Sequence, residues 1–390
     1  MGYRRITMEN TSWIELNRKA LNKNISYLKQ RIGANCVFAS VIKGNAYGHG
    51  IEQYIPLAEA CGIKLFAVYD AYEAYRALSI KKADTGLIIL GLLDQSQIEW
   101  AIINEIAFFV FDSDRLNATI ETARRIKKKA RIHIELETGL NRTGLDADDL
   151  PTIISLIKKN GRYLSLQGIC THYAGAESIS NYLRVQNQYK LFIDYCKTLK
   201  KAGISAPHHS ACSAAALTYP NTIMDMVRFG IAQYGIWPSM ETKMHNLLSE
   251  ESGFRRNPLK AVLSWKTRVM SLKTVMPGTF VNYGNAFLAT SKMRLATIPV
   301  GYHHGYSRSL SNTGHVLIRG RKADVVGMVN MNMFMVDVSR VPGIEVGDEV
   351  VLIGKQGDLS ITVASFSELT KMINYELLSR LPYQIPRHVV

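Results

Sequence analysis

Residues 37–50, Val-Phe-Ala-Ser-Val-Ile-Lys-Gly-Asn-Ala-Tyr-Gly-His-Gly, join a short apolar run to a lysine and a glycine-rich turn. The run Val37–Ile42 has the length of a buried strand, and its β-branched residues favour a strand over a helix. Runs of this kind recur as far as Phe229, separated by longer stretches with helical spacing. This alternation predicts βα units on a parallel sheet.

Counting these runs distinguishes the possible parallel folds. Eight βα repeats within roughly 200 residues favour a closed (β/α)₈ barrel of the TIM type over an open, doubly wound sheet, which usually has fewer strands. Amphipathic segments such as Ile153–Lys159 and Tyr182–Leu199 are the expected helices. The predicted strands are Val37–Ile42, Leu65–Val68, Leu87–Leu90, Ala107–Val110, Ile132–Leu136, Leu164–Cys170, His208–Ala211 and Met226–Phe229.

The pattern changes after Pro238. From Leu263 onward, short alternating runs punctuated by Gly and Asn predict a mostly antiparallel β-domain, with a single late helix around Val363–Arg380. A segment rich in Ser, Asn and Gly near residues 240–258 suits a linker. We therefore expect an α/β barrel domain over residues 12–245 and a mostly β C-terminal domain over residues 255–390.

Composition excludes several classes of protein. Among the 390 residues, 47% are apolar and 20% are charged, which excludes a disordered or low-complexity chain. No apolar run reaches the roughly 20 residues of a membrane-spanning helix, and residues 1–13 do not form a secretory signal. The five cysteines contain no C-x-x-C pair, so we expect reduced thiols and no metal site. Together these features predict a cytoplasmic protein with no membrane partner.

The net charge of +15, from 47 Lys and Arg and 32 Asp and Glu, leaves an anionic partner open. Its densest cluster is the run Arg124–Lys129, at the end of a predicted helix. Nucleic-acid binding is one interpretation, but no interleaved aromatics or recognised binding motif accompany the run. A solvated face whose charge complements the helix C-terminus is favoured, so we expect no nucleic-acid partner.

Lys43 is the first candidate for chemistry. It follows the first strand, and the C-terminal ends of barrel strands form the catalytic face of such folds. Desolvation there can lower the pKa of a lysine, so that its neutral amine attacks an aldehyde and forms an imine. A lysine in a surface salt bridge is the alternative interpretation of this residue alone.

The ten residues around Lys43 resemble the lysine signature of the alanine racemase family, whose enzymes depend on pyridoxal 5'-phosphate (PLP). The resemblance covers roughly residues 13 to 387, with its motifs in the expected order. Those motifs are Glu137–Gly144, Thr171–Ala174, Ser213–Ala215, Val227–Gly235, Tyr283-Gly284, Gly301-Tyr302, Met331 and Tyr375-Glu376.

The resemblance implies a role for each matching residue. Lys43 holds PLP covalently, Arg228 faces the pyridine nitrogen, and His172 packs beside the cofactor. Ser213 and Gly230-Ile231 also follow predicted strands at the end where barrels commonly bind phosphate. The implied phosphate-binding positions are Tyr47, Ser213, Gly230, Ile231 and Tyr375, and the substrate-binding positions include Arg142, Met331 and Tyr302.

Inversion at a carbon requires proton transfer on both of its faces. The resemblance assigns these transfers to Lys43 and to Tyr283, each with a pKa lowered by positive charge or desolvation. In the family this tyrosine comes from the partner subunit, which implies a homodimer with composite sites. The predicted reaction is the interconversion of L- and D-alanine, the step that supplies D-alanine for cell-wall synthesis.

Several positions depart from the family pattern. Glu135 stands where the family often has a carbamylated lysine that braces the arginine corresponding to Arg142. The other departures are Cys212, His304, Asn332, Met328 and Glu177, and several of their family counterparts line the substrate corridor. These changes leave two alternatives open, which are a racemase of another amino acid, such as serine, and a PLP-binding protein with little catalysis. Retention of both expected bases favours catalysis.

Overall fold

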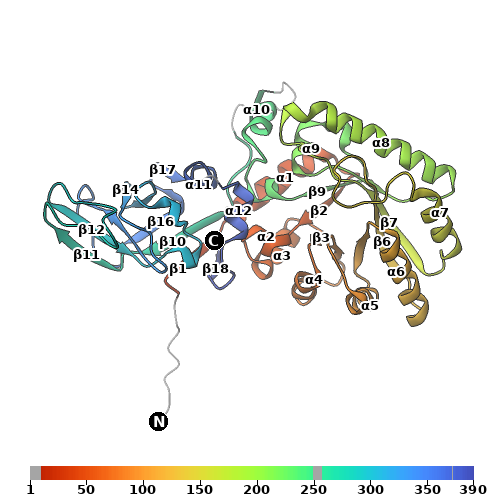
Figure 1. Ribbon diagram of the computed structural model, residues 1–390, viewed down its shortest axis with the longest axis horizontal. Coiled ribbons are helices and arrows are strands. Elements are labelled where there is room, and N and C mark those ends of the chain that lie inside the picture. The colour runs from red at the N-terminus through yellow and green to blue at the C-terminus, as the bar shows by residue number, and fades with distance from the viewer. Residues whose placement is uncertain (1–9, 249–256, 371) are drawn as a thin grey trace, which may run out of the picture. The chain divides into compact units, whose positions relative to one another are not determined.

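The computed structural model describes residues 10–248, 257–370 and 372–390 (Figure 1). The chain forms two compact units. One contains Lys19–Ala46 and Tyr54–Lys260 and is called the barrel unit. The other contains the described residues up to Arg18, Tyr47–Gln53 and the described residues from Ala261 to Val390, and is called the sheet unit.

Eight parallel strands form the barrel unit, as the sequence predicts. They pair in the order β8-β7-β6-β5-β4-β3-β2-β9. The two ends of this order are joined by hydrogen bonds from the Asp225 N–H to the His208 carbonyl (3.1 Å) and from the Arg228 N–H to the Ala211 carbonyl (3.0 Å). The strands are β2 (Val37–Val41), β3 (Leu65–Val68), β4 (Gly86–Ile89), β5 (Ala107–Val110), β6 (Ala130–Glu135), β7 (Leu164–Cys170), β8 (His208–His209) and β9 (Met226–Phe229).

Helices surround these strands on the outside of the barrel (Figure 1). Their starts are encoded by aspartates, since Asp70, Asp94 and Asp112 each accept a hydrogen bond from the backbone N–H three residues later. The two helices expected in advance are confirmed as α7 and α8. The helices from α1 to α10 are Arg18–Ile32, Lys43–Tyr47, Ile51–Ala60, Ala71–Leu78, Gln95–Ile103, Ser113–Ile126, Leu150–Lys159, Tyr182–Lys201, Ser213–Thr218 and Met240–Leu248.

Strands dominate the sheet unit, and all but one of the pairings in its ten-stranded sheet are antiparallel, which confirms the predicted β-domain. Its core contains Trp265, Tyr306 and Phe334, with the Tyr306 and Phe334 rings stacked at 4.3 Å between centroids. The strands are β1 (Ser12–Leu16), β10 (Leu263–Arg268), β11 (Ser271–Val275), β12 (Met293–Ile298), β13 (His315–Ile318), β14 (Arg321–Val326), β15 (Phe334–Asp337), β16 (Glu349–Gln356), β17 (Leu359–Ile361) and β18 (Arg387–Val389).

The prediction of one late helix is wrong, because two short helices replace it. α11 (Val363–Thr370) and α12 (Asn374–Ser379) are separate helices, and the backbone of Ile373, directly before α12, is extended. The apolar spacing continues across this break, so periodicity could not reveal it.

The expected linker region also differs, since Met240–Leu248 forms α10. Asn246 of this helix is buried and accepts a hydrogen bond from the Tyr27 hydroxyl at 2.6 Å. The next eight residues lie outside the described residues. The predicted limits divide the chain at one place, which assigns β1 to the barrel domain. In the structure β1 pairs with β10 and β18 of the sheet unit.

Candidate active site

Lys43 lies two residues after the end of β2, at the C-terminal end of the barrel strands. The four residues that follow it, Gly44–Tyr47 of α2, all have left-handed backbone angles, with φ of 63°, 55°, 54° and 51°. Such a conformation costs about 1–2 kcal/mol per residue that is not glycine. The surrounding structure must therefore hold this turn in place.

The electrostatic surroundings of Lys43 favour a neutral amine. Its side chain reaches solvent at the barrel mouth, yet the surrounding protein partly desolvates it and lowers its pKa. The guanidinium groups of Arg142 and Arg228 lower this pKa further, while Glu73 and Cys212 raise it. A lysine with this bias can act as a nucleophile and as a base.

Arg228, on β9, is buried and makes an unusual set of contacts. Its guanidinium donates to the carbonyls of Thr171 (2.7 Å), His209 (2.7 Å) and Ser210 (3.2 Å). It also lies 2.5 Å from His209 Nδ1 and 3.4 Å from His172 Nδ1. No carboxylate in the described part of the chain forms an ion pair with it. Neutral acceptors therefore hold a buried cation in a fixed orientation.

A pair of buried histidines extends this network. His209 Nε2 lies 2.9 Å from His133 Nδ1. Because arginine can only donate, Nδ1 of His209 must accept, which places the His209 proton on Nε2 and directs it to His133. Burial and the charge of Arg228 lower the pKa of His133 to about 3 and that of His209 well below its usual range. Both rings are therefore neutral.

Gly168 of β7 makes the contact between these two rings possible. A Cβ at this position would collide with His133 Nδ1 and would lie 2.8 Å from His209 Nε2. The β6–β7 register also shifts beside His133. The glycine, the two histidines and Arg228 thus form one continuous buried arrangement.

His172, just beyond β7, is half-buried, and its Nδ1 lies 3.4 Å from the guanidinium of Arg228. Burial is the largest cause that lowers its pKa to about 3, followed by the positive charges of Arg228, Arg142 and Lys43. The imidazole is neutral as a result. It can accept a hydrogen bond from Arg228 and leaves its second nitrogen for another contact.

Arg142 lies in a loop that folds around a carboxylate. Glu137 accepts hydrogen bonds from the backbone N–H groups of Gly139, Asn141 (2.8 Å) and Arg142 (3.4 Å). The side chain of Arg142 is exposed. Glu135 is buried and accepts from the Thr143 hydroxyl at 2.9 Å, and the described residues form no ion pair between Glu135 and Arg142.

Ser213 and the segment after β9 place polar groups together. The Ser213 hydroxyl accepts from the backbone N–H groups of Gly230 (3.0 Å) and Ala232 (3.5 Å). Ser213, Gly230 and Ile231 are all buried. Hydroxyl groups and backbone N–H groups are among the groups that bind phosphate oxygens in proteins.

Tyr47 and Tyr375 lie close together within the sheet unit. Their ring centroids are 6.0 Å apart. Arg387 fixes the loop after Tyr47, because its guanidinium donates twice to the Gly48 carbonyl, at 2.9 and 3.2 Å. The two tyrosines predicted to bind phosphate are therefore brought together, although 328 positions separate them in the sequence (375 − 47).

Tyr283, Tyr302 and Met331 come from loops that contact one another in the sheet unit. Asn282 donates to the Met328 carbonyl (2.7 Å) and accepts from Asn330 (2.8 Å), which ties the loop of Tyr283 to the loop of Met331. The Tyr302 N–H donates to the Asn330 carbonyl (3.0 Å). The side chains of Tyr283, Tyr302 and Met331 remain 73%, 42% and 56% exposed.

The comparisons with known proteins cover nearly the whole chain. The family model "Alanine racemase, N-terminal domain" matches residues 16–238, and "Alanine racemase, C-terminal domain" matches residues 262–389. An alanine racemase of Leptospira interrogans is 33% identical over 386 residues, covering 97% of this chain and 96% of the relative. The chain belongs to the alanine racemase family.

Solved structures of alanine racemases share the fold. The enzyme of Bacillus anthracis, described with bound L-Ala-P, has a TM-score of 0.89 and 27% identity, covering 99% of this chain and 96% of that one. The enzyme of Bartonella henselae, described with covalently bound pyridoxal phosphate, has a TM-score of 0.83 and 24% identity, covering 98% and 100%.

The departures from the alanine racemase pattern occupy varied environments. His304 accepts a hydrogen bond from the Gly301 N–H at 3.1 Å, and the Met328 carbonyl accepts from Asn282. Cys212 is half-buried and forms the N-cap position of α9. The remaining two, Asn332 and Glu177, have exposed side chains.

The importance of His133, His209 and Gly168 was not predicted from the sequence. The available signal was weak, since it consisted of polar residues within apolar strands. A histidine in a strand is compatible with many structures, and only the fold shows that these two rings, 76 positions apart, meet.

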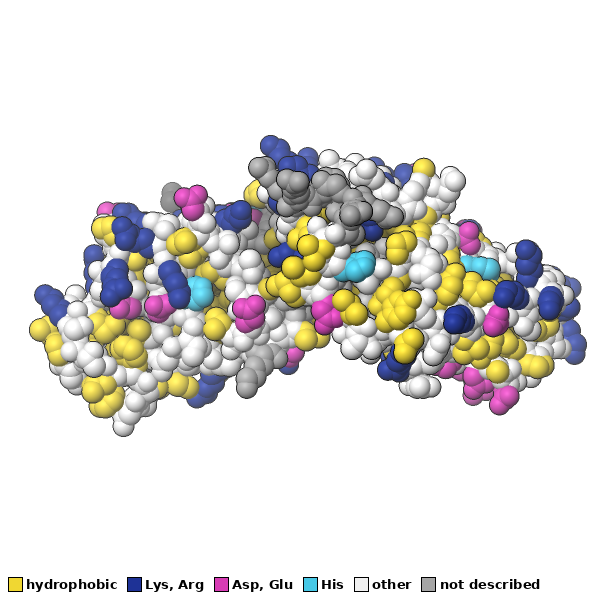
Figure 2. All heavy atoms as spheres, turned by 90° about the horizontal axis from the view of Figure 1, so that it is seen from above, with side chains coloured by type: hydrophobic (Ala, Val, Ile, Leu, Met, Phe, Trp, Pro, Cys, Tyr) yellow, Lys and Arg dark blue, Asp and Glu magenta, His cyan; other side chains and the backbone are white. Residues whose placement is uncertain are grey.

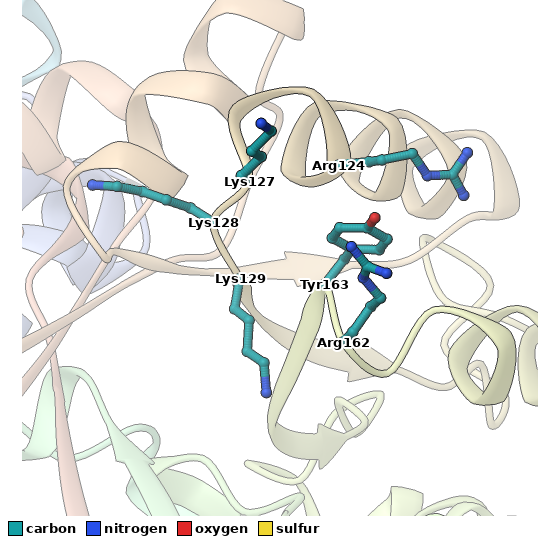
Figure 3. A pocket seen from close by; sticks show the side chains of 6 residues that line it. All are labelled: Arg124, Lys127, Lys128, Lys129, Arg162 and Tyr163. Atoms are coloured by element: carbon teal, nitrogen blue, oxygen red, sulfur yellow. The ribbon is translucent and has the colours of Figure 1, made fainter.

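A separate hollow of about 450 Å³ lies at the opposite end of the barrel, where β6 and β7 begin. In Figure 3 its lysine side chains point in different directions and do not converge on one position. On the face shown in Figure 2, basic and acidic side chains are mixed over both units. The lining residues are Arg124, Lys127, Lys128, Lys129, Arg162 and Tyr163.

None of the helices among the described residues is both long enough and apolar enough to span a bilayer. The five cysteines form no disulfide within the described part of the chain.

Proposed function

We propose that this chain is a PLP-dependent racemase that interconverts L- and D-alanine by a two-base mechanism. The observation that carries the proposal is that Lys43 follows a barrel strand at the end where the fixed, buried Arg228 acts electrostatically on its amine, in a chain that matches the alanine racemase family over nearly its full length. The further parts of the proposal are a homodimer, a cytoplasmic location and the residue roles given below.

The polar groups of the barrel unit fit PLP. Lys43 offers an amine for the aldehyde, and Arg228 is a permanent donor for the ring nitrogen. Ser213 and the backbone amides of Gly230 and Ile231 are proposed to bind the phosphate, together with Tyr47 and Tyr375. When bound, PLP supplies the electron sink that makes a substrate Cα–H acidic.

Arg228 determines how strongly that electron sink acts. Its guanidinium keeps its protons at neutral pH, so an acceptor that faces it stays unprotonated. The carbonyls of Thr171, Ser210 and His209 hold the guanidinium still. His172 supports it on one side. A weaker electron sink suits an enzyme that moves one proton and avoids other bond cleavages.

Lys43 and Tyr283 are the proposed bases on the two faces of the substrate. Lys43 Nζ would take or return the proton on one face, and Tyr283 Oη would do so on the other. Tyr283 is mostly exposed on its own unit, which suits a residue that acts in the site of a partner subunit. The exposed guanidinium of Arg142 is proposed to bind the substrate near its carboxylate, with Tyr302 and Met331 lining the approach.

Tyr375 is proposed to favour alanine over serine by narrowing the pocket beside the substrate side chain. A serine hydroxyl would lose water without gaining a partner there, at a cost of about 1–3 kcal/mol. Competition between the two substrates measures this selectivity. Alanine should have the higher kcat/KM, and Tyr375→Asn should reduce the ratio of alanine to serine.

The test of the proposed function has two parts. Purified protein with PLP should show the absorbance band of a lysine imine, and Lys43→Ala should lack it. Loss of optical activity is then measured with L-alanine, L-serine and L-lysine. Faster racemisation of serine or lysine would support a racemase of another amino acid. An imine band without racemisation would support a PLP-binding protein, and the absence of both would contradict the proposal.

A further inference from the structure

Glu73 connects helix α4 to the turn that follows Lys43. Its carboxylate is buried, and Oε1 accepts a hydrogen bond from the Asn45 N–H at 2.9 Å. The second oxygen, Oε2, accepts from the Tyr69 N–H at 3.0 Å. One side chain thus joins the left-handed turn after β2 to the end of the neighbouring strand β3.

Asn45 is held by α4 a second time. Arg76, one helical turn after Glu73, donates through Nη2 to the Asn45 side-chain oxygen at 2.8 Å. Asn45 is one of the three non-glycine residues with left-handed backbone in this turn. Glu73 and Arg76 of α4 therefore hold the backbone and the side chain of Asn45 by hydrogen bonds. Asn45 has a strained backbone and lies two positions after Lys43.

Glu73 also balances charge around Lys43. The groups that act on the amine from the surrounding elements are Arg142, Arg228, Glu73 and Cys212. The two guanidinium groups disfavour a protonated amine, whereas the carboxylate of Glu73 favours it. Burial raises the pKa of Glu73, but the Asn45 and Tyr69 N–H groups favour its charged form.

We propose that Glu73 is a positioning residue for Lys43. Its carboxylate holds the left-handed turn and supplies a negative charge whose effect on the Lys43 amine opposes that of Arg142 and Arg228. This inference rests on the proposed function of Lys43 as the residue that binds PLP. It assigns two separable roles to one carboxylate, the geometry of the turn and the protonation of the amine.

Imine formation in the full-length protein tests both roles. The Lys43 amine adds to the aldehyde of PLP and water leaves, so the rate depends on the neutral fraction of the amine. The rate is followed by absorbance as a function of pH, and borohydride trapping with peptide mass analysis confirms that Lys43 is the modified residue. The pH at which the rate is half its plateau then reports on protonation, and the plateau reports on positioning.

Two variants of Glu73 separate the roles. Glu73→Gln removes the charge at nearly constant shape, so its half-plateau pH should move lower. Its amide nitrogen cannot accept from an N–H, so one of the two hydrogen bonds is also lost and its plateau rate should fall as well. Glu73→Asp keeps the charge but is too short to reach both N–H groups. Its half-plateau pH should change little, while its plateau rate should fall about threefold or more.

Asp70→Asn is the matched control. Asp70 caps the same helix and accepts from the Glu73 N–H, but its carboxylate is not bonded to the turn. Asparagine remains a good N-cap, so the change removes one nearby charge and retains the helix. It should leave both the half-plateau pH and the plateau close to those of the unaltered protein.

Equal half-plateau pH values for Glu73→Gln, Asp70→Asn and the unaltered protein would overturn the electrostatic role. An unchanged plateau in Glu73→Asp would overturn the positioning role, and this test of positioning remains available if Glu73→Gln does not fold. A failure of the proposed function looks different, because the unaltered protein would then form no imine at Lys43.

Discussion

The two groups of candidate active-site residues are built in opposite ways. Around Arg228 in the barrel unit, a buried cation, two neutral histidines and several carbonyls satisfy one another. Around Tyr283 in the sheet unit, loops fix the backbone but leave the side chain 73% exposed. The polar groups around Arg228 find their partners within the barrel unit, whereas the Tyr283 side chain is exposed on the sheet unit.

This difference separates stability from function. Changes in the Arg228 network should affect folding because they disturb buried polar groups. Changes at Tyr283 should affect activity with little effect on folding, because the side chain has few contacts of its own.

The largest effect on activity is expected for Tyr283→Phe. Loss of one proton-transfer group should lower kcat for racemisation by about 10²–10⁴-fold. The free energy of unfolding should change by less than about 0.5 kcal/mol. Tyr383→Phe is the control, because Tyr383 has similar exposure, 70%, in the same unit. A large loss of stability at Tyr283, or equal activity losses in both variants, would remove the contrast.

Gly168→Ala should be the largest stability change. The added methyl would force the His133 and His209 rings apart, at a cost of about 1–3 kcal/mol measured by urea unfolding. Gly161→Ala serves as the control because its Cβ would meet only ordinary contacts, at 3.7 Å or more. Equal stability of the two variants would contradict the prediction, because it would mean that the two histidine rings can move apart at no cost in free energy.

The pH dependence of stability should reflect the neutral histidines. The pKa of His133 is about 3 in the folded state, below its ordinary value near 6.5, so the unfolded chain binds more protons between these values. Stability should therefore fall as the pH drops below about 6.5. His133→Gln should reduce this loss, measured by unfolding at about pH 7.5 and pH 5. His388→Gln, at an exposed position, should retain the full loss; identical slopes in both variants would contradict the assignment.

The smallest effect is expected from bicarbonate. Glu135 is a carboxylate without modification, and it contacts Thr143 rather than pairing with Arg142. Racemisation should therefore be unchanged when bicarbonate is removed, and Glu135→Gln should alter kcat/KM by less than about threefold, since glutamine can still accept from Thr143. Activity that required bicarbonate would show that the role given to Glu135 is mistaken.

The sequence predicted the barrel well because most of its strands are buried on both faces and contain short apolar runs, although β6, β7 and β8 also carry polar residues. All eight predicted strands correspond to β2–β9, with limits shifted by at most two residues. The pairing of β1 with β10 and β18 was not predicted, because partners in a sheet that are distant in sequence leave no local pattern.

The candidate site was predicted from motifs. As with the strand pairings, contacts between residues distant in sequence could not be predicted. Lys43, Arg228 and His172 stand at strand ends, which sequence patterns can locate. Two contacts depend on how strands and helices pack together. They are the contact of His133 with His209 and the hydrogen bond that Glu73 accepts from the Asn45 N–H. Such contacts are set by the fold and not by the spacing of residues.

Mixing two inactive variants tests the central claim. The claim is that Lys43 in the barrel unit of one subunit and Tyr283 in the sheet unit of its partner form one active site in a homodimer. Lys43→Ala lacks one proposed base, and Tyr283→Phe lacks the other. When the two proteins are refolded together, hybrid dimers contain one site with both bases, so racemisation should return to about a quarter of the unaltered activity, given random pairing of subunits. No recovery despite confirmed subunit exchange would contradict the account and would place both bases within one chain.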